Sequence, residues 1–285
     1  GFVAITVIAL QFVVPNRAAA FTAPFGIDRL IRFHRAVGFV VLALVAAHVI
    51  AVVGEEDAYA DWINPTEAPT AGRLGLVAVA LLLVLVLTAL WRRVLRIPYE
   101  TWRGLHVVLG LGAVGVAFGH VIAISRFTQT GTIRWLTLGF VVLALVAAFY
   151  LRVGRQFVLA RRPYRLARSS FEEDGSVTLE LEALDHDGAP FAAGQFAWIK
   201  HAGAPYALTE HPFSYASSAH DPARPSFTDK PAGHFTGRLR DLEVGERMLI
   251  DGPHGSPAVV DERDTVLIAG GSGITPSLSV LRTAA

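Results

Sequence analysis

The chain has 285 residues, of which 53% are hydrophobic, and a mean hydropathy of +0.46. This composition excludes a single soluble domain and indicates a membrane protein. The formal net charge is +1, and no basic patch carries interleaved aromatic residues, so we expect no nucleic-acid partner. The absence of cysteine excludes disulfides, thiolate metal sites and cysteine nucleophiles.

The two halves of the chain differ in character. Residues 1–153 hold nearly all the long apolar runs, and residues 160–285 read as soluble. The chain begins without Met inside an apolar run and ends soon after a glycine turn, so we expect a piece of a longer protein. We predict a transmembrane domain over 1–158, a small antiparallel β-barrel over 159–260 and the truncated start of an α/β nucleotide-binding domain over 261–285.

Four membrane spans are predicted in the first half, and together they form an all-α helical bundle. They cover residues 36–53, 74–91, 105–124 and 135–151, and residues 3–14 look like the end of an earlier span. Each is close to the roughly 20 residues that cross a hydrocarbon core of about 30 Å.

The charges between the spans predict their orientation. Arginines concentrate in residues 15–35, 92–104 and 152–162, whereas the loop 54–71 is acidic and has no Lys or Arg. The positive-inside rule therefore places the arginine-rich segments and the soluble half in the cytoplasm, although Arg126 in a short outer loop departs from it. We expect a multi-pass protein of the cell (inner) membrane whose partner surface is the lipid bilayer. The sequence carries no indication of oligomeric state.

Two pairs of histidines lie in the predicted spans with identical spacing. His34 and His48 are 14 residues apart, as are His106 and His120. On an α-helix this spacing is just under four turns and about 21 Å of rise, so each pair projects from one face at two depths. Because both spans run from inside to outside, we expect His34 to meet His106 near the cytoplasmic face and His48 to meet His120 near the outer face. Two stacked His–His sites could hold two b haems through axial imidazoles.

Other interpretations of these histidines remain open. A histidine in an apolar helix is often a hydrogen-bonded packing residue, and a proton relay is a further alternative. Zinc is disfavoured because each level supplies two ligands where zinc takes four. Small residues near the histidines leave room for a macrocycle or permit close helix packing. They are Gly38, Ala46, Ala47, Gly110, Gly112, Gly115 and Gly119.

The soluble half has the pattern of short strands and turns. Residues 177–181 alternate between apolar and polar, residues 194–199 form a second short strand, and residues 248–250 lead into a turn. A helical patch is expected over 237–242. This arrangement favours a small antiparallel barrel.

The last segment predicts a strand, a glycine turn and a helix. Residues 265–269 are a continuous apolar run, as in a parallel strand buried on both faces, and a helix is expected over 277–282. Such a turn offers backbone N–H groups to a phosphate. An ordinary tight turn is the alternative, because the glycine spacing over 270–276 is not the full G-x-G-x-x-G pattern.

Several motifs occur in a characteristic order. They are His211-Pro212-Phe213-Ser214, the segments 233–239, 252–255 and 270–276, His34-Arg35, and residues 99–106. With the two histidine spacings, they resemble the ferric reductase and NADPH oxidase family over nearly the whole chain. His254 stands where the family usually has Tyr, which puts an aromatic contact there in doubt.

The resemblance implies a transmembrane flavocytochrome b that uses FAD, two b haems and NADPH, with NADH as an alternative. Phe213 would stack on the isoalloxazine, Ser214 would hydrogen-bond near its reactive nitrogen, and His211 would lie by the ribityl-phosphate. Backbone amides around Phe235 and Thr236 would hold the diphosphate. The implied cofactor-binding residues are His211, Pro212, Phe213, Ser214, Gly233, His234, Phe235, Thr236, Gly271, Gly273, Thr275 and Pro276, and the implied metal ligands are His34, His48, His106 and His120.

The expected activity is an oxidoreductase that passes electrons from cytoplasmic NADPH to an acceptor outside. A ferric or cupric chelate is the first candidate, and the acidic loop 54–71 would attract a cationic complex, although solubility and topology also explain its charge. Oxygen, reduced to superoxide, is the alternative, but the oxidases of the family tend to carry a polar His where this chain has Val52. A non-enzymatic haem-binding conduit or sensor subunit, and a channel or transporter with a histidine relay, belong to other classes.

Overall fold

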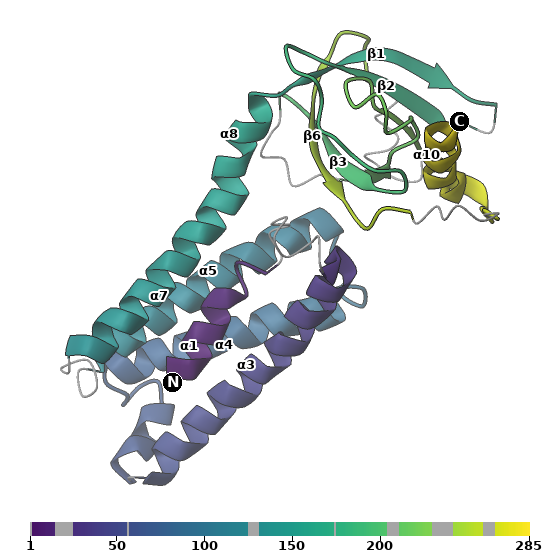
Figure 1. The fold of residues 1–285 in the computed structure, drawn as a ribbon. Coiled ribbons are helices and arrows are strands. Elements are labelled where there is room, and N and C mark those ends of the chain that lie inside the picture. The colour runs from purple at the N-terminus through teal and green to yellow at the C-terminus, as the bar shows by residue number, and fades with distance from the viewer. Residues whose placement is uncertain are drawn as a thin grey trace. The chain divides into compact units, whose positions relative to one another are not determined.

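The computed structural model describes residues 2–14, 25–55, 57–124, 131–173, 175–203, 211–229, 242–258 and 266–285. The chain divides into two compact units (Figure 1). The helical unit comprises residues 1–17 and 28–151, and the sheet unit comprises residues 18–27 and 152–285. The boundary between Leu151 and Arg152 precedes the end of the predicted transmembrane domain, and residues 261–285 are grouped with the sheet unit instead of standing apart.

The helical unit contains three helices that are long and apolar enough to cross a membrane, counted among the described residues. They are α3 (Ile27–Glu55), α4 (Thr70–Trp91) and α5 (Tyr99–Ala123), and they confirm three of the predicted spans. The fourth predicted span falls on α7 (Gly131–Phe149), in which the described apolar stretch Leu138–Phe149 is shorter. The chain continues through a π-helical turn, η2 (Tyr150–Gly154), into α8 (Arg155–Ala160).

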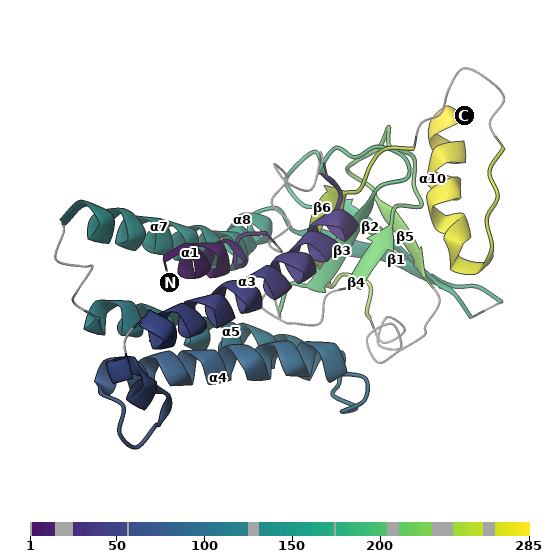
Figure 2. The ribbon, with the colours of Figure 1, turned by 90° about the horizontal axis from the view of Figure 1, so that it is seen from below.

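Packing within the helical unit is uneven. Helices α4 and α5 lie side by side, and α1 (Phe2–Leu10) lies against α7 and α5 (Figure 2). Among the described residues, α3 and α5 lack the close backbone packing that joins α4 to α5. A small core of Ile5, Ala9, Val141 and Ala144 connects α1 to α7.

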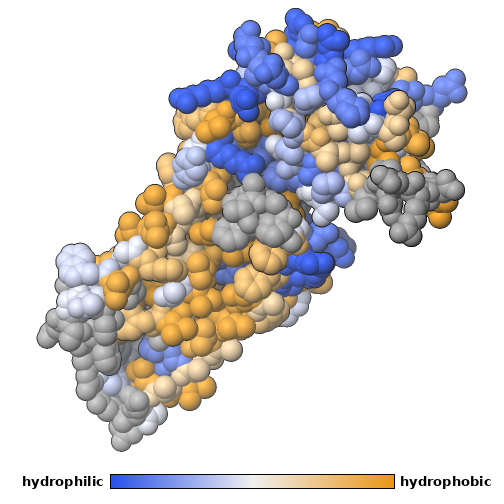
Figure 3. Space-filling model, in the orientation of Figure 1, coloured by the Kyte–Doolittle hydropathy of each residue, from blue (hydrophilic) through white to orange (hydrophobic). Residues whose placement is uncertain are grey.

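The surface of the helical unit is apolar on the face that Figure 3 shows. In the most apolar windows, only 6% of the residues of α3 and α4 and 17% of those of α5 are buried. Water would oppose such exposure, whereas a hydrocarbon solvent does not. The helical unit is therefore built as a membrane domain.

In its described residues, the sheet unit holds six antiparallel strands in the order β4-β3-β6-β1-β2-β5. They are β1 (Tyr164–Phe171), β2 (Val177–Ala183), β3 (Phe196–His201), β4 (His211–Ser214), β5 (Ser226–Asp229) and β6 (Arg247–His254). The predicted strands over 177–181 and 194–199 are confirmed as β2 and β3. The predicted barrel is confirmed only in part, because the ladder stays open between β4 and β5, where the described chain shows one bridge, Tyr215 with Phe227.

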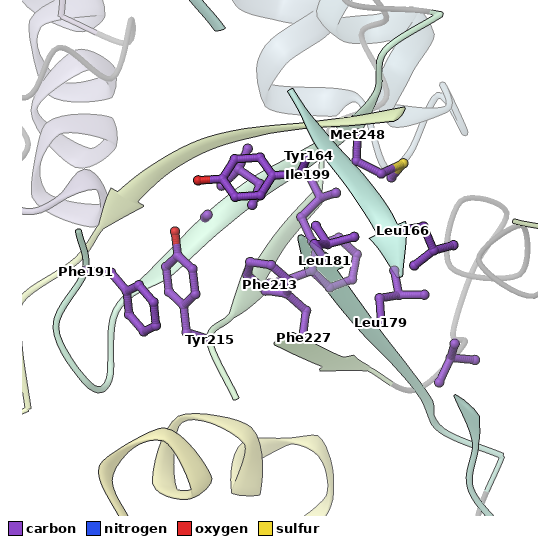
Figure 4. Close-up of a cluster of buried hydrophobic side chains, with 13 residues drawn as sticks. Tyr164, Leu166, Leu179, Leu181, Phe191, Ile199, Phe213, Tyr215, Phe227 and Met248 are labelled. Atoms are coloured by element: carbon purple, nitrogen blue, oxygen red, sulfur yellow. The ribbon is translucent and has the colours of Figure 1, made fainter. Parts of the chain in front are cut away.

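Alternate residues of the strands build one hydrophobic core (Figure 4). Val177, Leu179 and Leu181 of β2 all point inward and are each 1% exposed. The Phe191 and Tyr215 rings stack with centroids 3.9 Å apart at 8°. These contacts fix the sheet on which β4 and the turn after β6 are placed.

Helix α8 is fastened to this sheet by buried polar contacts. Arg155 Nη2 lies 2.6 Å from Asp251 Oδ1, and His254 Nε2 lies 3.3 Å from the same oxygen. Lys200 Nζ donates to Gln156 Oε1 at 2.8 Å. Asp251 and Lys200 are only 3% and 2% exposed, so each buried charge has its partner.

The predicted parallel strand at 265–269 is wrong over its described part, 266–269. Those residues form no strand, and Val266 and Ile268 are 82% and 94% exposed. A buried parallel strand needs neighbouring strands and covering helices, and among the described residues none lies beside it. The helix that follows is confirmed as α10 (Ile274–Ala284), held by Ser279 Oγ donating to Ser217 O at 2.8 Å.

Tyr215→Phe is expected to make the sheet unit more resistant to alkali. Burial, followed by the nearby Tyr164 and Asp251, raises the pKa of Tyr215 above the ordinary 10.0. Below pH 10 the tyrosine is protonated in both states and its contribution is complete. Above pH 10 the unfolded chain releases a proton that the folded chain retains, so stability falls by up to about 1.4 kcal/mol per pH unit.

Thermal unfolding of the full chain at pH 8 and pH 11 tests this prediction. The variant should stay within about 1 kcal/mol of the parent at pH 8 and exceed it at pH 11. The same change at Tyr150, which is 59% exposed, serves as the control. An equal loss of stability at pH 11 in the parent and in Tyr215→Phe would contradict it.

Candidate functional site

The structure brings together the histidine pairs that the sequence predicted. His34 on α3 faces His106 on α5, with ring centroids 6.1 Å apart and planes at 65°. His48 on α3 faces His120 on α5, with centroids 6.4 Å apart and planes at 71°. We call these the inner pair and the outer pair.

The ring spacing suits a shared metal ion. Two imidazoles that bind one ion from opposite sides, each with a metal–nitrogen distance of about 2 Å, have ring centres roughly 6 Å apart. Both pairs have this separation. Within the described ranges no group of three or more His, Cys, Asp or Glu side chains gathers, so each pair supplies two protein ligands.

A cavity surrounds the outer pair. His48 and His120 line it together with apolar side chains of α1, α3, α4 and α5, and none of its described lining residues is charged. Tyr59 and Trp62 of the short helix η1 (Asp57–Ile63) also line it, with their rings 5.0 Å apart. Such walls fit the apolar faces of a porphyrin.

Helix α4 orients His120 of the outer pair. The Nδ1 atom of His120 lies 2.8 Å from the carbonyl oxygen of Ala71. Because a carbonyl only accepts, Nδ1 carries the proton and Nε2 keeps a lone pair for a metal. Gly75 lies against the same ring, since a Cβ there would come within 3.0 Å of His120 Cε1 and Nδ1. The backbone of α4 thus forms a cradle that a side chain would fill.

Buried polar atoms without partners gather at the inner pair. In the part of the chain that is described, Gln11 Oε1, His34 Nδ1, Trp102 Nε1 and His106 Nδ1 are buried and make no hydrogen bond. Gln11 Nε2 donates to His34 O at 2.9 Å, and the Trp102 and His106 rings have centroids 5.2 Å apart. An unsatisfied buried group costs about 1–3 kcal/mol, so this level favours a polar ligand.

The structure separates the two interpretations of the small residues. A Cβ on Gly110, Gly112 or Gly119 would meet Phe12 at 3.3 Å, Leu81 at 3.5 Å or Leu74 at 3.7 Å, which indicates close packing. A Cβ on Gly38 or Gly115 would meet nothing within 4 Å, so these two leave open space. Ala46 and Ala47 are exposed.

The predicted flavin segment forms an edge strand of the sheet. Residues 211–214 are β4, paired with β3 in the register Ala197–Phe213. Phe213 is 4% exposed and belongs to the core (Figure 4). The stacking role that the resemblance implies for it stays a prediction. Along a strand successive side chains alternate in direction, and Phe213 takes the inward position while Pro212 is exposed. Ser214 is half-buried, and the side chain of His211 lies outside the described residues.

Gly233, His234, Phe235 and Thr236 also lie outside the described residues. His254 is described, and its substitution for Tyr keeps an aromatic contact. Its ring meets Trp198 edge-on, with centroids 4.9 Å apart at 76°.

The glycine turn is open, but Thr275 has another role. Gly271 and Gly273 are exposed, with nothing within 4 Å of a Cβ placed on either, and Gly271 has φ +56. Thr275 is 2% exposed, and its hydroxyl lies 3.1 Å from Thr228 O and 2.9 Å from Ser272 O. The hydroxyl therefore anchors the start of α10, and the contact with a dinucleotide that the resemblance implies for Thr275 stays a prediction. Pro276 is half-buried.

Several residues of the site were missed by sequence reasoning. Ala71, Gly75, Tyr59 and Trp62 carry no motif, and a contact between a backbone carbonyl and a distant imidazole leaves no pattern in the sequence. Trp102 was visible only as part of a motif.

Known proteins of different kinds resemble different parts of the chain. Residues 1–118 match the family described as ferric reductase like transmembrane component. The reductase component of propane 2-monooxygenase from Rhodococcus jostii is 34% identical over 112 residues, which are 37% of this chain and 29% of that protein. The probable electron transfer subunit of dihydroorotate dehydrogenase B (NAD(+)) from Thermococcus kodakarensis is 32% identical over 110 residues, 38% of this chain and 42% of that protein.

Solved structures give weaker likenesses. The ferredoxin reductase in carbazole 1,9a-dioxygenase has 22% identity and a TM-score of 0.37, over 42% of this chain and 37% of that chain. Phthalate dioxygenase reductase has 23% identity and a TM-score of 0.36, over 42% of this chain and 38% of that chain. The chain spans less than half the length of each relative named here.

Gly75→Ala is expected to empty the outer site selectively. The added methyl would lie 3.0 Å from the His120 ring, push it away and break its bond to Ala71 O. Loss of such an orienting contact typically lowers metal affinity by about 10–100-fold. The haem content of the purified full chain, measured as the pyridine haemochrome, should fall from two per chain towards one.

Gly119→Ala is the matched control. It also adds one methyl beside His120, but the new Cβ would meet Leu74 at an ordinary 3.7 Å. This variant should keep both haems. Full haem content in Gly75→Ala would show that α4 does not position the outer ligand.

Proposed function

We propose, from the premise that residues 1–118 belong to the ferric reductase like transmembrane component family, that this protein transfers electrons across a membrane. The donor is NADPH, with NADH as the alternative, and the carriers are FAD and two b haems held by the inner and outer histidine pairs. The acceptor is a ferric or cupric chelate on the outer side. The family resemblance read from the sequence is confirmed over residues 1–118.

The single observation that carries this proposal is the pairing of imidazoles at two depths. Both pairs come from the same two membrane-length helices, with ring centroids 6.1 and 6.4 Å apart. An isolated histidine in a membrane helix has several explanations. Two facing pairs in register, one inside a cavity whose described lining residues carry no charge, favour ligation of haem.

The similarity to a reductase component and to an electron transfer subunit with NAD(+) in its name supports the donor side. When bound, flavin accepts two electrons from a nicotinamide and releases them singly to one-electron carriers such as haem. In this chain the exposed backbone of Gly271 and Gly273 is available to a nucleotide phosphate. The outer face of β4 would lie beside the flavin, with Ser214 as its polar residue.

The proposed orientation follows the charges. Arg29, Arg32 and Arg35 lie on the first turns of α3, at the end nearer the inner pair, whereas the exposed Asp61 and Glu67 lie beyond the outer pair. By the positive-inside rule, these charges support the proposal that the inner pair and the sheet unit face the cytoplasm.

The outer cavity bears on the choice of acceptor. A haem held by two imidazoles would relay electrons and would not bind the acceptor directly. Val52 lines the cavity at the position where oxidases of the family carry a polar His, so no proton donor stands there. The lack of a polar histidine at this position, which the oxidases of the family tend to carry, favours a metal chelate over oxygen as the acceptor.

Spectra and turnover of the purified full chain test the proposal. We expect reduced-minus-oxidised b-type haem bands, two haems per chain and NADPH-dependent reduction of a ferric chelate that persists without oxygen. Superoxide as the main product would show that the acceptor is oxygen and not a metal chelate. Haem without flavin would support the conduit or sensor, and a preparation without haem would refute the proposal.

His106→Ala is expected to remove the inner haem and stop electron flow while NADPH still reduces the flavin. The remaining His34 is a single ligand and cannot hold the iron from both sides. Stopped-flow spectra should show flavin bleaching without haem reduction. His201→Ala, which removes an exposed imidazole of the sheet unit, is the control and should behave as the parent. Two haems retained in His106→Ala would contradict the pairing.

A further inference from the structure

The inner and outer pairs differ in whether the polar atoms around them have hydrogen-bond partners. At the outer pair His120 has its hydrogen bond to Ala71 O. At the inner pair the indole nitrogen of Trp102 is buried and has no partner among the described residues. An indole N–H can only donate, and buried tryptophans usually find an acceptor. The inner site therefore presents a donor that awaits an acceptor oxygen.

A cation stands beside this donor. The guanidinium carbon of Arg92, just after α4, lies 5.4 Å from the Tyr99 ring centre and 5.6 Å from that of Trp102, at the start of α5. These cation–π contacts hold Arg92 at the aromatic pair. The Trp102 ring in turn lies 5.2 Å from the ring of His106. One corner of the helical unit thus contains the positive charge of Arg92, the unpaired N–H of Trp102 and the ring of His106.

We propose that Trp102 and Arg92 bind a propionate carboxylate of the inner haem. This inference rests on the proposed function. A b haem is apolar except for its two propionates, and an unpaired carboxylate in an apolar bundle is costly. The corner formed by Trp102 and Arg92 supplies the hydrogen bond and the charge that such a carboxylate needs. It orients the macrocycle with this carboxylate towards the arginine-rich end of α4 and α5.

A phosphate of a lipid headgroup is the other source of an anionic oxygen at this corner. The position of Trp102 one turn before His106 favours the propionate, because the indole adjoins the ligand itself. A lipid phosphate would be indifferent to the chemistry of the haem. That difference is what the experiment uses.

The test is a cycle of two changes in the full chain. His120→Ala serves as the background, so that only the inner pair binds, and haem or haem dimethyl ester is titrated into it, followed by the Soret band. With Trp102 present, the ester should bind about tenfold more weakly than haem, because a hydrogen bond to a charged group contributes roughly 1.5–3 kcal/mol. With Trp102→Phe, the two should bind within about threefold of one another.

Trp91→Phe is the matched control. Trp91 is 54% exposed at the end of α4, and its replacement should leave the tenfold preference intact. An unchanged preference in Trp102→Phe would overturn the inference and assign the corner to lipid or to packing. If the preference is unchanged but the parent chain binds haem, the proposed function stands. If the parent chain binds no haem, the proposed function and the propionate inference are both refuted.

The His120→Ala background could fail to fold, so a second measurement uses the chain with both histidine pairs intact. Trp102→Phe leaves the propionate charge less compensated, which favours ferric iron. The midpoint potential of one haem should therefore fall in a potentiometric titration while that of the other stays constant. Unchanged potentials for both haems would also overturn the inference.

Discussion

The meeting of imidazoles from α3 and α5 is the constraint on which the helical unit depends. Two helices that packed backbone to backbone would leave no space between their histidines. Here α4 and α5 are the close pair, and the described parts of α3 and α5 approach mainly through their side chains, with the rings 6.1 and 6.4 Å apart. The gap costs van der Waals contacts between the helices. A cofactor that bridges them offsets that loss.

The two levels are built differently around the same ligand type. The outer level is uncharged and has its imidazole oriented by the backbone of α4, whereas the inner level keeps buried polar atoms without partners. Such a difference in polarity shifts the potential of an iron centre through its surroundings and not through its ligands. On the proposed function, this asymmetry would make the potentials of the two haems differ.

The sequence predicted what depends on periodicity and missed what depends on close approach. The spacing of 14 residues placed His34, His48, His106 and His120 on two facing helix surfaces, and alternation predicted β2 and β3. The flavin role of Phe213 came from the family resemblance, whereas its burial in the core follows from the side of β4 on which it lies. Gly75 and Ala71 act through a backbone surface, and the apolar run at 266–269 lacks the neighbours that would make it a strand among the described residues. These features arise from tertiary contacts, which no local pattern encodes.

Because both pairs sit on the same two helices, they share one mechanical register. A shift of α3 along α5 by a single turn, about 5.4 Å, would separate both pairs at once. Filling either level therefore pins the helices in the alignment that the other level requires. On the proposed function, loading of one site would therefore raise the affinity of the other.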